Sequence, residues 1–173
     1  MRIFRYIKRN IVLFLVNKIF VGTEPRFFST KAKLLRSIGY KIGQNTSIVA
    51  PIICTGKLEI GDNCWIGANF TIRGNGTVKL GNNIDVGPDV TFLTGTHHIG
   101  DSNRRAGLGY NCNMTIGDGC WIGGKSTFVN KIAIGKASII AACACVCKNV
   151  PESVIVGGIP ARIIKTLDNE KVD

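Results

Sequence analysis

The sequence predicts a mainly β fold in which short parallel strands follow one another around a single-stranded β-helix. Three observations predict it: a six-residue period, glycine after many of its members, and steady phase over most of the chain. The clearest members are Ile42-Gly43, Ile60-Gly61, Ile66-Gly67, Leu80-Gly81, Val86-Gly87, Ile116-Gly117, Ile122-Gly123 and Ile134-Gly135. A period of six matches neither an α-helix nor an alternating strand. It fits a three-sided coil that points one aliphatic residue per side inward, while stacked coils pair by parallel hydrogen bonds.

Length and composition fit one globular domain. The chain has 173 residues, of which 45% are hydrophobic and 19% charged, and its 21 glycines against 5 prolines favour tight turns within regular structure. We expect an N-terminal amphipathic helix and connector over residues 1–40 and the β-helix over residues 41–151. Residues 152–173 are expected to form a short strand, a turn and a basic tail of helical character.

The hexad phase breaks at two places. Two residues are inserted around Arg73-Gly74-Asn75-Gly76, and the pattern lapses between Phe92 and Ile116, which predicts an inserted loop at 94–113. Both histidines of the chain, His97 and His98, lie in that loop. Because a regular solenoid gains nothing in stability from a long polar excursion, such a loop usually serves binding or chemistry.

The charge balance favours anionic partners. Lys and Arg number 22 against 11 Asp and Glu, so the formal net charge is +11. Nucleotide phosphates, acidic glycans or an anionic membrane surface suit such a surplus, and simple solubility charge is the alternative. Nucleic acid is disfavoured because the sequence has no helix-turn-helix, zinc-finger or RNA-binding signature.

Cysteine usage predicts a reducing, cytoplasmic location. Seven cysteines include no CxxC pair, and no secretory signal is evident. The alternating Cys143, Cys145 and Cys147 are interpreted as packing residues rather than metal ligands, since nearby partner ligands are missing. No metal is expected.

The first twenty residues combine basic and apolar side chains. The uninterrupted apolar run from Ile11 to Val16 is far shorter than the ~20 residues of a membrane-spanning helix. Apolar positions 3, 4, 7, 11, 14 and 15 fall on one helical face, with basic residues around it. Two interpretations stay open: a helix packed on its own domain, or peripheral contact of residues 1–20 with the inner face of a membrane.

Four stretches resemble the hexapeptide-repeat acyltransferases, and the resemblance covers about residues 40 to 166. They are NNIDVGPDVTFLTGTHH, NRRAG, TIGDGCWIGG and VCKNVPESVIVGGIPARIIK. The sequence is most similar to the maltose and galactoside O-acetyltransferase branch, which includes enzymes of surface-polysaccharide synthesis. This resemblance implies a left-handed coil, a homotrimer with active sites between subunits, and acetyl-CoA as co-substrate. The chain departs from the family pattern at His98, Cys143 and Cys147.

The resemblance assigns His97 as the catalytic general base. A histidine suits removal of a hydroxyl proton at neutral pH, and direct attack on the thioester requires no covalent enzyme intermediate. His98 is the alternative base and, like Asn69 and Arg104, a candidate substrate contact. Asp89 or Asp101 would orient the imidazole, and a backbone amide near Gly123 and Gly124 would stabilise the oxyanion. By the same resemblance the coenzyme groove is lined by Gly124, Ala142, Cys147, Lys148, Arg162 and Lys165.

The sequence therefore predicts an O-acetyltransferase that acts on a sugar hydroxyl in the synthesis of capsule, lipopolysaccharide or exopolysaccharide. A small acceptor such as serine, a drug or an amino sugar is the first alternative. A metal hydratase resembling the γ-type carbonic anhydrases would need three separated zinc-binding histidines, whereas this chain has two adjacent ones. A β-helix scaffold that has lost catalysis is the remaining alternative.

Overall fold

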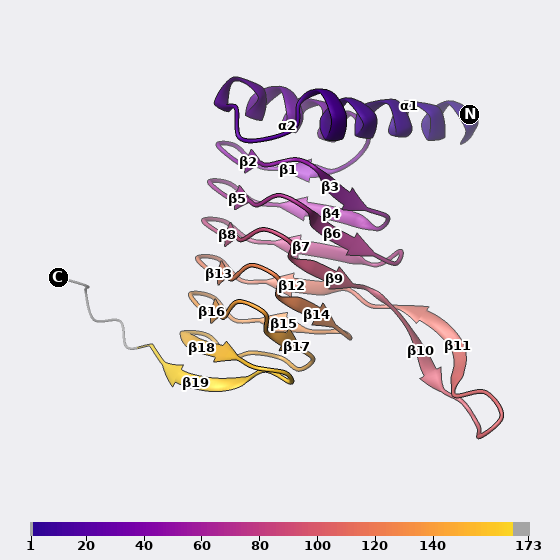
Figure 1. Cartoon of the computed structure of the whole chain (residues 1–173), viewed down its shortest axis with the longest axis vertical. Coiled ribbons are helices and arrows are strands. Elements are labelled where there is room, and N and C mark those ends of the chain that lie inside the picture. The colour runs from indigo at the N-terminus through magenta and orange to yellow at the C-terminus, as the bar shows by residue number, and fades with distance from the viewer. Residues whose placement is uncertain (1, 168–173) are drawn as a thin grey trace.

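The computed structural model describes residues 2–167, which form a stack of about six coils capped at one end by helices (Figure 1). Each full coil gives one short strand to each of three parallel sheets. The first sheet holds β1 (Lys41–Ile42), β4 (Lys57–Ile60), β7 (Thr77–Leu80), β12 (Met114–Ile116) and β15 (Ala133–Ile134). The second holds β2 (Ser47–Ile48), β5 (Trp65–Ile66), β8 (Asp85–Val86), β13 (Trp121–Ile122), β16 (Ile139–Ile140) and β18 (Val154–Gly157). The third holds β3 (Ile52–Cys54), β6 (Phe70–Arg73), β9 (Thr91–Leu93), β14 (Thr127–Val129) and β17 (Cys145–Val146).

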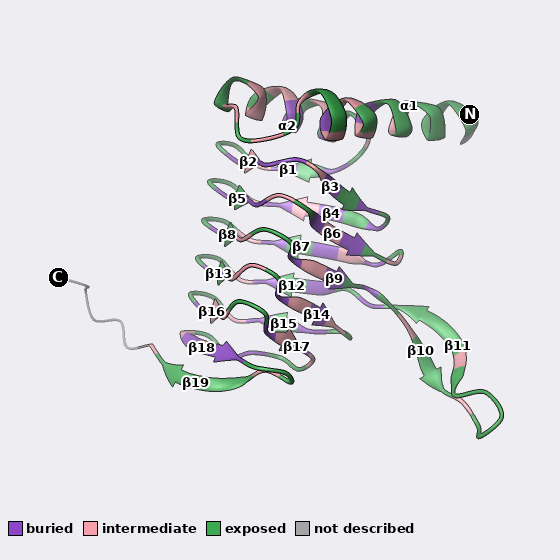
Figure 2. Cartoon of the chain, in the orientation of Figure 1, coloured by how far each residue is buried: buried purple, intermediate pink, exposed green. Residues whose placement is uncertain are grey.

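The hexad residues form one continuous core along the inside of the stack (Figure 2). Its centre is an aromatic column in which Phe70, Phe92 and Phe128 are completely buried. Their ring centroids lie 5.5 Å and 4.5 Å apart from one coil to the next. The Phe92 and Phe128 rings are stacked at 11°, and the Phe70 ring is tilted against Phe92 at 46°, so equivalent positions of successive coils pack directly on one another.

The glycine after the aliphatic residue is required by the spacing between coils. A Cβ added at Gly43 would lie 2.2 Å from the carbonyl oxygen of Gly61 in the next coil. No side chain fits at that distance, so the Ile-Gly pairs seen in the sequence mark corners where successive backbones touch.

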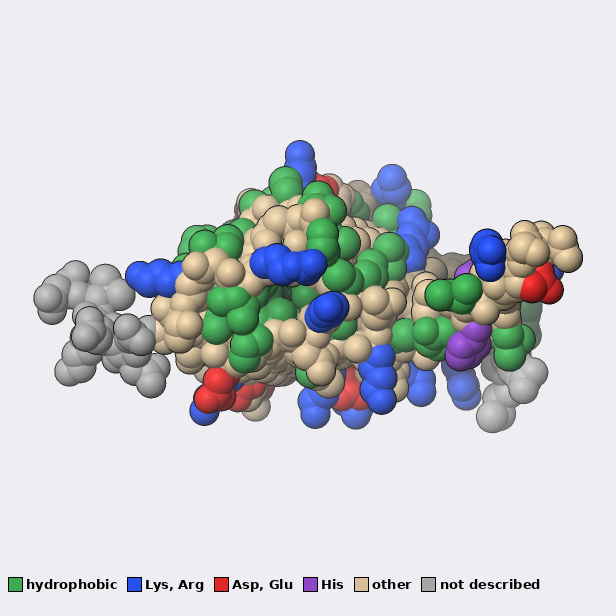
Figure 3. Space-filling model, turned by 90° about the horizontal axis from the view of Figure 1, so that it is seen from below, with side chains coloured by type: hydrophobic (Ala, Val, Ile, Leu, Met, Phe, Trp, Pro, Cys, Tyr) green, Lys and Arg blue, Asp and Glu red, His purple; other side chains and the backbone are tan. Residues whose placement is uncertain are grey.

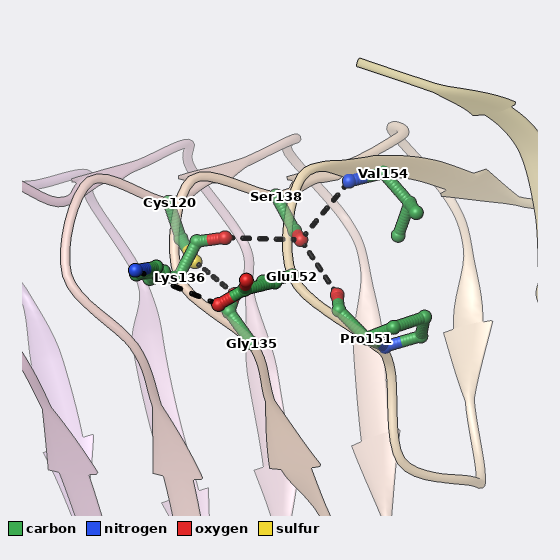
Figure 4. A network of polar contacts seen from close by, with 7 residues as sticks. All are labelled: Cys120, Gly135, Lys136, Ser138, Pro151, Glu152 and Val154. Atoms are coloured by element: carbon green, nitrogen blue, oxygen red, sulfur yellow. Dashed lines mark hydrogen bonds and ion pairs between the residues drawn. The ribbon is translucent and has the colours of Figure 1, made fainter. Parts of the chain in front are cut away.

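Small polar side chains bind successive coils together at one corner (Figure 4). The Ser138 hydroxyl donates to the Pro151 carbonyl at 2.8 Å and accepts from the Val154 amide at 3.3 Å. In the preceding coil the Cys120 thiol donates to the Gly135 carbonyl at 3.1 Å. Cys64 does the same toward Gly81 at 3.3 Å, and burial raises the pKa of both thiols. These two cysteines therefore act as structural hydrogen-bond donors.

The N-terminal helices close the open end of the stack. They are α1 (Arg2–Phe14), its continuation as a π-helical turn η1 (Leu15–Ile19), the short η2 (Pro25–Phe27) and α2 (Phe28–Ser37). The side-chain amide of Asn17 donates to the Ile52 carbonyl at 2.8 Å and accepts from the Ile52 amide at 2.9 Å. Arg36 donates to the carbonyls of Ile42 and Gly43. These contacts satisfy backbone groups of the first coil that have no preceding coil to pair with.

Two sequence expectations need correction at the ends of the chain. The segment before residue 41 is more than a connector, because it contains the helix α2. The basic tail is a strand over its described part: β19 (Arg162–Thr166) runs antiparallel to β18. The expectation of helical character there was wrong because β18 is an edge strand whose free backbone groups pair with β19. The rest of the predicted tail, residues 168–173, lies outside the described residues.

Candidate active site

The predicted loop at 94–113 is a long β-hairpin that projects from the stack (Figures 1 and 3). Its strands are β10 (Gly95–Ile99) and β11 (Ala106–Asn111), which pair in antiparallel fashion. The hairpin leaves the stack after β9 and returns to β12, so it carries both histidines away from the core.

The two breaks in the hexad phase meet at the root of this hairpin. The buried hydroxyl of Thr94 donates to the Arg73 carbonyl at 2.9 Å and accepts from the Gly76 amide at 3.2 Å. The Asn111 side chain accepts from the Asn75 amide at 2.8 Å. A Cβ at Gly76 would lie 1.9 Å from the carbonyl oxygen of Cys112. The insertion at 73–76 therefore forms hydrogen bonds that fix the root of the hairpin on the stack.

The two histidines have different surroundings on the hairpin. The imidazole of His98 stacks on the ring of Tyr110, with centroids 4.4 Å apart and planes inclined by 30°. His97 pairs instead with Gly109, and its ring edge is 3.5 Å from the position that a Cβ of Gly109 would occupy. Because Gly109 has no side chain, the exposed imidazole of His97 is left open to an approaching molecule.

Neither candidate aspartate is held at an imidazole. The Asp101 carboxylate accepts from the backbone amides of Asn103 and Arg104 and so shapes the hairpin tip. The Asp89 carboxylate accepts from the side chain of Asn69 at 2.8 Å.

The two predicted substrate contacts away from the histidines lie in different places. Arg104 is exposed at the hairpin tip. Asn69 lies on the stack, at the corner between β5 and β6, where it is engaged with Asp89 of the next coil. A single chain therefore does not bring Asn69 and Arg104 together around His97.

Half of the predicted coenzyme residues line one hollow at the C-terminal end of the stack. The turn at 158–161 folds back against β17, where the Cys145 amide donates to the Gly158 carbonyl at 3.0 Å and the Ala161 amide donates to the Cys145 carbonyl at 2.8 Å. Gly158 adopts a φ of 93°, which an L side chain rarely does. This turn places Arg162 beside Cys147 and Lys148. The hollow is lined by Val146, Cys147, Lys148, Asn149, Val150, Pro151, Val156, Ala161, Arg162 and Ile163.

The remaining coenzyme candidates adjoin this hollow without lining it. Gly124 and Ala142 occupy the same corner in successive coils, where the Cys143 amide donates to the Gly124 carbonyl at 3.0 Å. The next step down that corner is the turn at 158–161. Lys165 is exposed on β19 and pairs with Ile155.

Sequence reasoning missed Gly109 and Tyr110. Their positions depend on the cross-strand register of the hairpin, which shifts between His97 and Ile99. The residues in the loop have no hexad period to reveal that register, so only a hairpin prediction with the bulge in place could have found them.

Two apolar side chains on the hairpin have little contact with their own chain. Ile99 is 89% exposed and Leu108 is 79% exposed. Large exposed apolar side chains beside a chemically competent residue are typical of a surface that another molecule covers.

The described chain has no metal centre: residues 2–167 contain no group of three or more His, Cys, Asp or Glu side chains able to hold an ion. The same residues include no helix long and apolar enough to cross a bilayer.

Comparison with known proteins gives one consistent picture. A protein of Saccharomyces cerevisiae named "Putative acetyltransferase YJL218W" is 33% identical over 83% of this chain and 74% of its own length. Galactoside O-acetyltransferase of Escherichia coli is 28% identical over 87% of this chain and 75% of its own length. The "Putative colanic acid biosynthesis acetyltransferase WcaF" of E. coli is 28% identical, over 85% and 80% respectively. No protein-family model matches the chain.

The fold is also that of a solved acetyltransferase. The hexapeptide-repeat acetyltransferase VCA0836 of Vibrio cholerae, in complex with acetyl coenzyme A, superposes with a TM-score of 0.81 at 25% sequence identity. The match covers 94% of this chain and 86% of that one. The left-handed parallel β-helix predicted from the sequence is confirmed by this likeness.

Proposed function

This chain belongs to the hexapeptide-repeat, acetyl-CoA-dependent acetyltransferases, and from that premise we propose that it acetylates a sugar hydroxyl with His97 as general base. The observation that carries the proposal is the open imidazole of His97 opposite Gly109, on a hairpin whose root is fixed by buried hydrogen bonds. A general base needs this combination of access and fixed position.

The reaction balances without help from another residue of the chain. His97 takes the proton from the acceptor hydroxyl as the oxygen attacks the thioester carbonyl. The carbon–sulfur bond then breaks, and the imidazolium returns its proton to the departing thiolate of CoA. The cysteines need no catalytic role in this sequence, since the acetyl group passes directly to the acceptor oxygen.

The hollow at the C-terminal end suits the nucleotide end of acetyl-CoA. Lys148 and Arg162 are exposed beside it and can make charge-assisted bonds to phosphates. The corner that runs through Gly124 and Ala142 offers backbone groups to the extended pantetheine arm. We assign Cys147 to the same groove because it lines the hollow, and Lys165 because it is an exposed cation on β19.

The site requires more than one copy of the chain. His97 is exposed on a hairpin that projects from its own stack (Figure 1), and the apolar side chains of Ile99 and Leu108 on the same hairpin are exposed as well. We propose a homotrimer in which the hairpin of one subunit reaches the coenzyme groove of the next. Arg104 at the hairpin tip and Asn69 on the stack would then contact the acceptor from different subunits.

The acceptor is proposed to be a glycan of surface-polysaccharide synthesis, at the cytoplasmic face of the membrane. The similarity to WcaF supports this class of acceptor, and the net charge of +11 suits acidic glycans. A small sugar is the second candidate, favoured by the similarity to galactoside O-acetyltransferase. Residues 1–20 are proposed to contact the membrane surface.

Thiol release from acetyl-CoA tests the proposal. The purified chain and its His97→Ala and His98→Ala variants are given acetyl-CoA and a panel of glycans, simple sugars and serine. We expect acceptor-dependent release that falls about 10²-fold or more in His97→Ala and by much less in His98→Ala. Equal losses in both variants would remove the assignment of His97. Binding of acetyl-CoA without turnover on any acceptor would favour the scaffold alternative.

A further inference from the structure

Helix α1 has one face that packs on the domain and an opposite face that is exposed. Arg9, Val12 and Val16 pack toward the first coil, where Arg9 donates to the Tyr40 hydroxyl at 2.8 Å and to the Cys54 carbonyl. The sequence-derived interpretation of a helix packed on its own domain thus describes this face. It leaves the opposite face unexplained.

The opposite face is an exposed apolar stripe. Residues three and four apart share one side of a helix, so the apolar positions of α1 line up along its length. The stripe consists of Ile3, Phe4, Ile7, Ile11 and Phe14, all exposed, with Phe4 at 75%. At 100° per residue these positions centre nearly opposite Val12 and Val16. Burial on the domain therefore cannot account for them.

The charges around this stripe have one sign. Residues 2–19 contain no Asp or Glu, and the first acidic residue of the chain is Glu24. Arg5, Lys8 and Lys18 are exposed on α1 and η1. A hollow beside the N-terminal half of α1 is lined by Phe4, Arg5, Lys8, Arg9, Ser37, Ile38 and Gly39. Apolar side chains next to cations with no compensating acid match an anionic lipid surface.

The place of α1 in the fold orients this stripe. Figure 1 shows α1 lying across the end of the stack, with its N-terminal part extending past the coils. Because Val12 and Val16 face the coils, the apolar stripe points away from them, out of the end of the molecule. The stripe can therefore lie flat on a bilayer while the stack stands away from it. Subunits related by an axis along the stack would present their stripes in one plane.

A second copy of the chain is the competing occupant of the stripe. Two α1 helices packed stripe to stripe would bring their cations together, and no carboxylate on either helix would neutralise them. Such a pair gains apolar burial at the expense of charge repulsion, whereas an anionic bilayer satisfies both sets of side chains.

We propose that α1 docks the protein on an anionic membrane surface, with the stripe in the interface and Lys8 and Lys18 at the lipid headgroups. The root of the His97 hairpin is two coil spacings, about 10 Å, from the first coil. Helix α1 adds about another 10 Å. The root of the His97 hairpin would then stand roughly 20 Å from the headgroups. The hairpin runs from there away from α1 (Figure 1), so the acceptor would be a glycan long enough to extend past the root from its lipid. The docking itself does not rest on the acetyl-transfer reaction.

Vesicle sedimentation tests the docking with the full chain. Vesicles of phosphatidylcholine alone are compared with vesicles that contain 30% phosphatidylglycerol, a proportion on the order of that in anionic membrane surfaces. The variants are Phe4→Ser with Ile7→Ser, and Lys8→Glu with Lys18→Glu. Ile99→Ser is the control, because it removes an apolar side chain that is 89% exposed from the hairpin, away from α1. Circular dichroism verifies that each variant is folded.

We expect the chain to bind the anionic vesicles at least 10-fold more tightly than the neutral ones. Each double variant should lose at least 10-fold of that binding, while Ile99→Ser keeps it. Weak binding of the unaltered chain, or binding that survives both double variants, would overturn the proposal. So would a change in oligomeric state by light scattering in Phe4→Ser with Ile7→Ser, since it would assign the stripe to a second copy. Thiol release on a water-soluble acceptor should be unchanged in both double variants, which separates a failure of docking from a failure of the proposed activity.

Discussion

Gly109 lies across the hairpin from His97, and a Cβ at Gly109 would be 3.5 Å from both Cδ2 and Nε2 of the imidazole. That distance is ordinary van der Waals contact, so a methyl group fits there and a larger side chain does not fit without displacing the ring. The absence of a side chain at Gly109 is therefore what keeps the proposed base accessible.

Substitution at Gly109 should affect catalysis in proportion to side-chain size. Gly109→Ala should change kcat/KM by less than about threefold, whereas Gly109→Leu should lower it about 10-fold or more by displacing the imidazole. Steady-state kinetics and thermal unfolding of both variants provide the measurement. Gly95→Ala is the control, because its Cβ would meet its nearest neighbours at 3.5 Å, away from His97. Full activity in Gly109→Leu would show that the acceptor does not approach this side of the ring.

Lys148 and Arg162 should act on coenzyme binding and leave the chemical step nearly unchanged. Each lies at the hollow proposed for the nucleotide phosphates, away from the reacting atoms. Loss of one charge-assisted bond, about 1.5 kcal/mol, corresponds to roughly a 10-fold higher KM for acetyl-CoA in Lys148→Ala or Arg162→Ala. Lys33→Ala, on α2 at the other end of the stack, should leave KM as it is. A fall in kcat at constant KM in the first two variants would contradict the assigned role.

Asn17 should contribute to stability through both of its bonds to Ile52. Asn17→Ala leaves an amide and a carbonyl of the first coil without partners, which should cost about 1–3 kcal/mol of unfolding free energy. Asn10→Ala, at an exposed position of the same helix, should cost little. Denaturant unfolding of the two variants measures the difference. Equal stability of Asn17→Ala and Asn10→Ala would mean that water replaces the hydrogen bonds from Asn17 to Ile52.

Alkaline pH should weaken the attachment of α1. Burial raises the pKa of Tyr40 to about 12 and that of Cys54 to about 12, from their ordinary values of 10.0 and 9.0. A raised folded-state pKa contributes stability that is complete below the unfolded-state pKa and is lost as pH rises through the folded-state value. We therefore expect the Tm to fall between about pH 9 and pH 12.

Tyr40→Phe separates this effect from other titrations. The variant should be less stable at pH 7, because it loses the bonds to Arg9 and to the Cys54 carbonyl. Its Tm should then fall less steeply above pH 9 than that of the unaltered chain. Burial lowers the pKa of Lys31, which acts in the opposite direction, so the comparison of slopes carries the test. Parallel slopes would show that Tyr40 ionises without unfolding its surroundings.

Regular hexads made most of the fold readable in advance. Ile42 and Ile60, or Ile116 and Ile134, are 18 residues apart and pair directly in the structure. A repeat of this kind is local, because each residue packs on its equivalents one coil above and below. The positions of the breaks at 73–76 and 94–113 were visible for the same reason.

The sequence did not predict that the two breaks in the hexad phase contact each other at the root of the hairpin. That Gly76 and Thr94 meet at one hairpin root depends on the pairing of coils whose sequence separation the insertion lengthens, since Ile60 pairs with Leu80. The helix α2 and the strand β19 were missed because each forms against an exposed end of the stack, where the demand for hydrogen-bond partners outweighs local propensity.

The sequence by itself determined the repeat, the coil and the resemblance that identifies the reaction class. The tertiary structure decided what each exposed histidine faces, because the cross-strand register of the hairpin sets Gly109 opposite His97 and brings Tyr110 against His98. The tertiary structure also decided which face of α1 is exposed. A helical period assigns apolar residues to a face, but only the folded domain shows which face of the helix is buried against it.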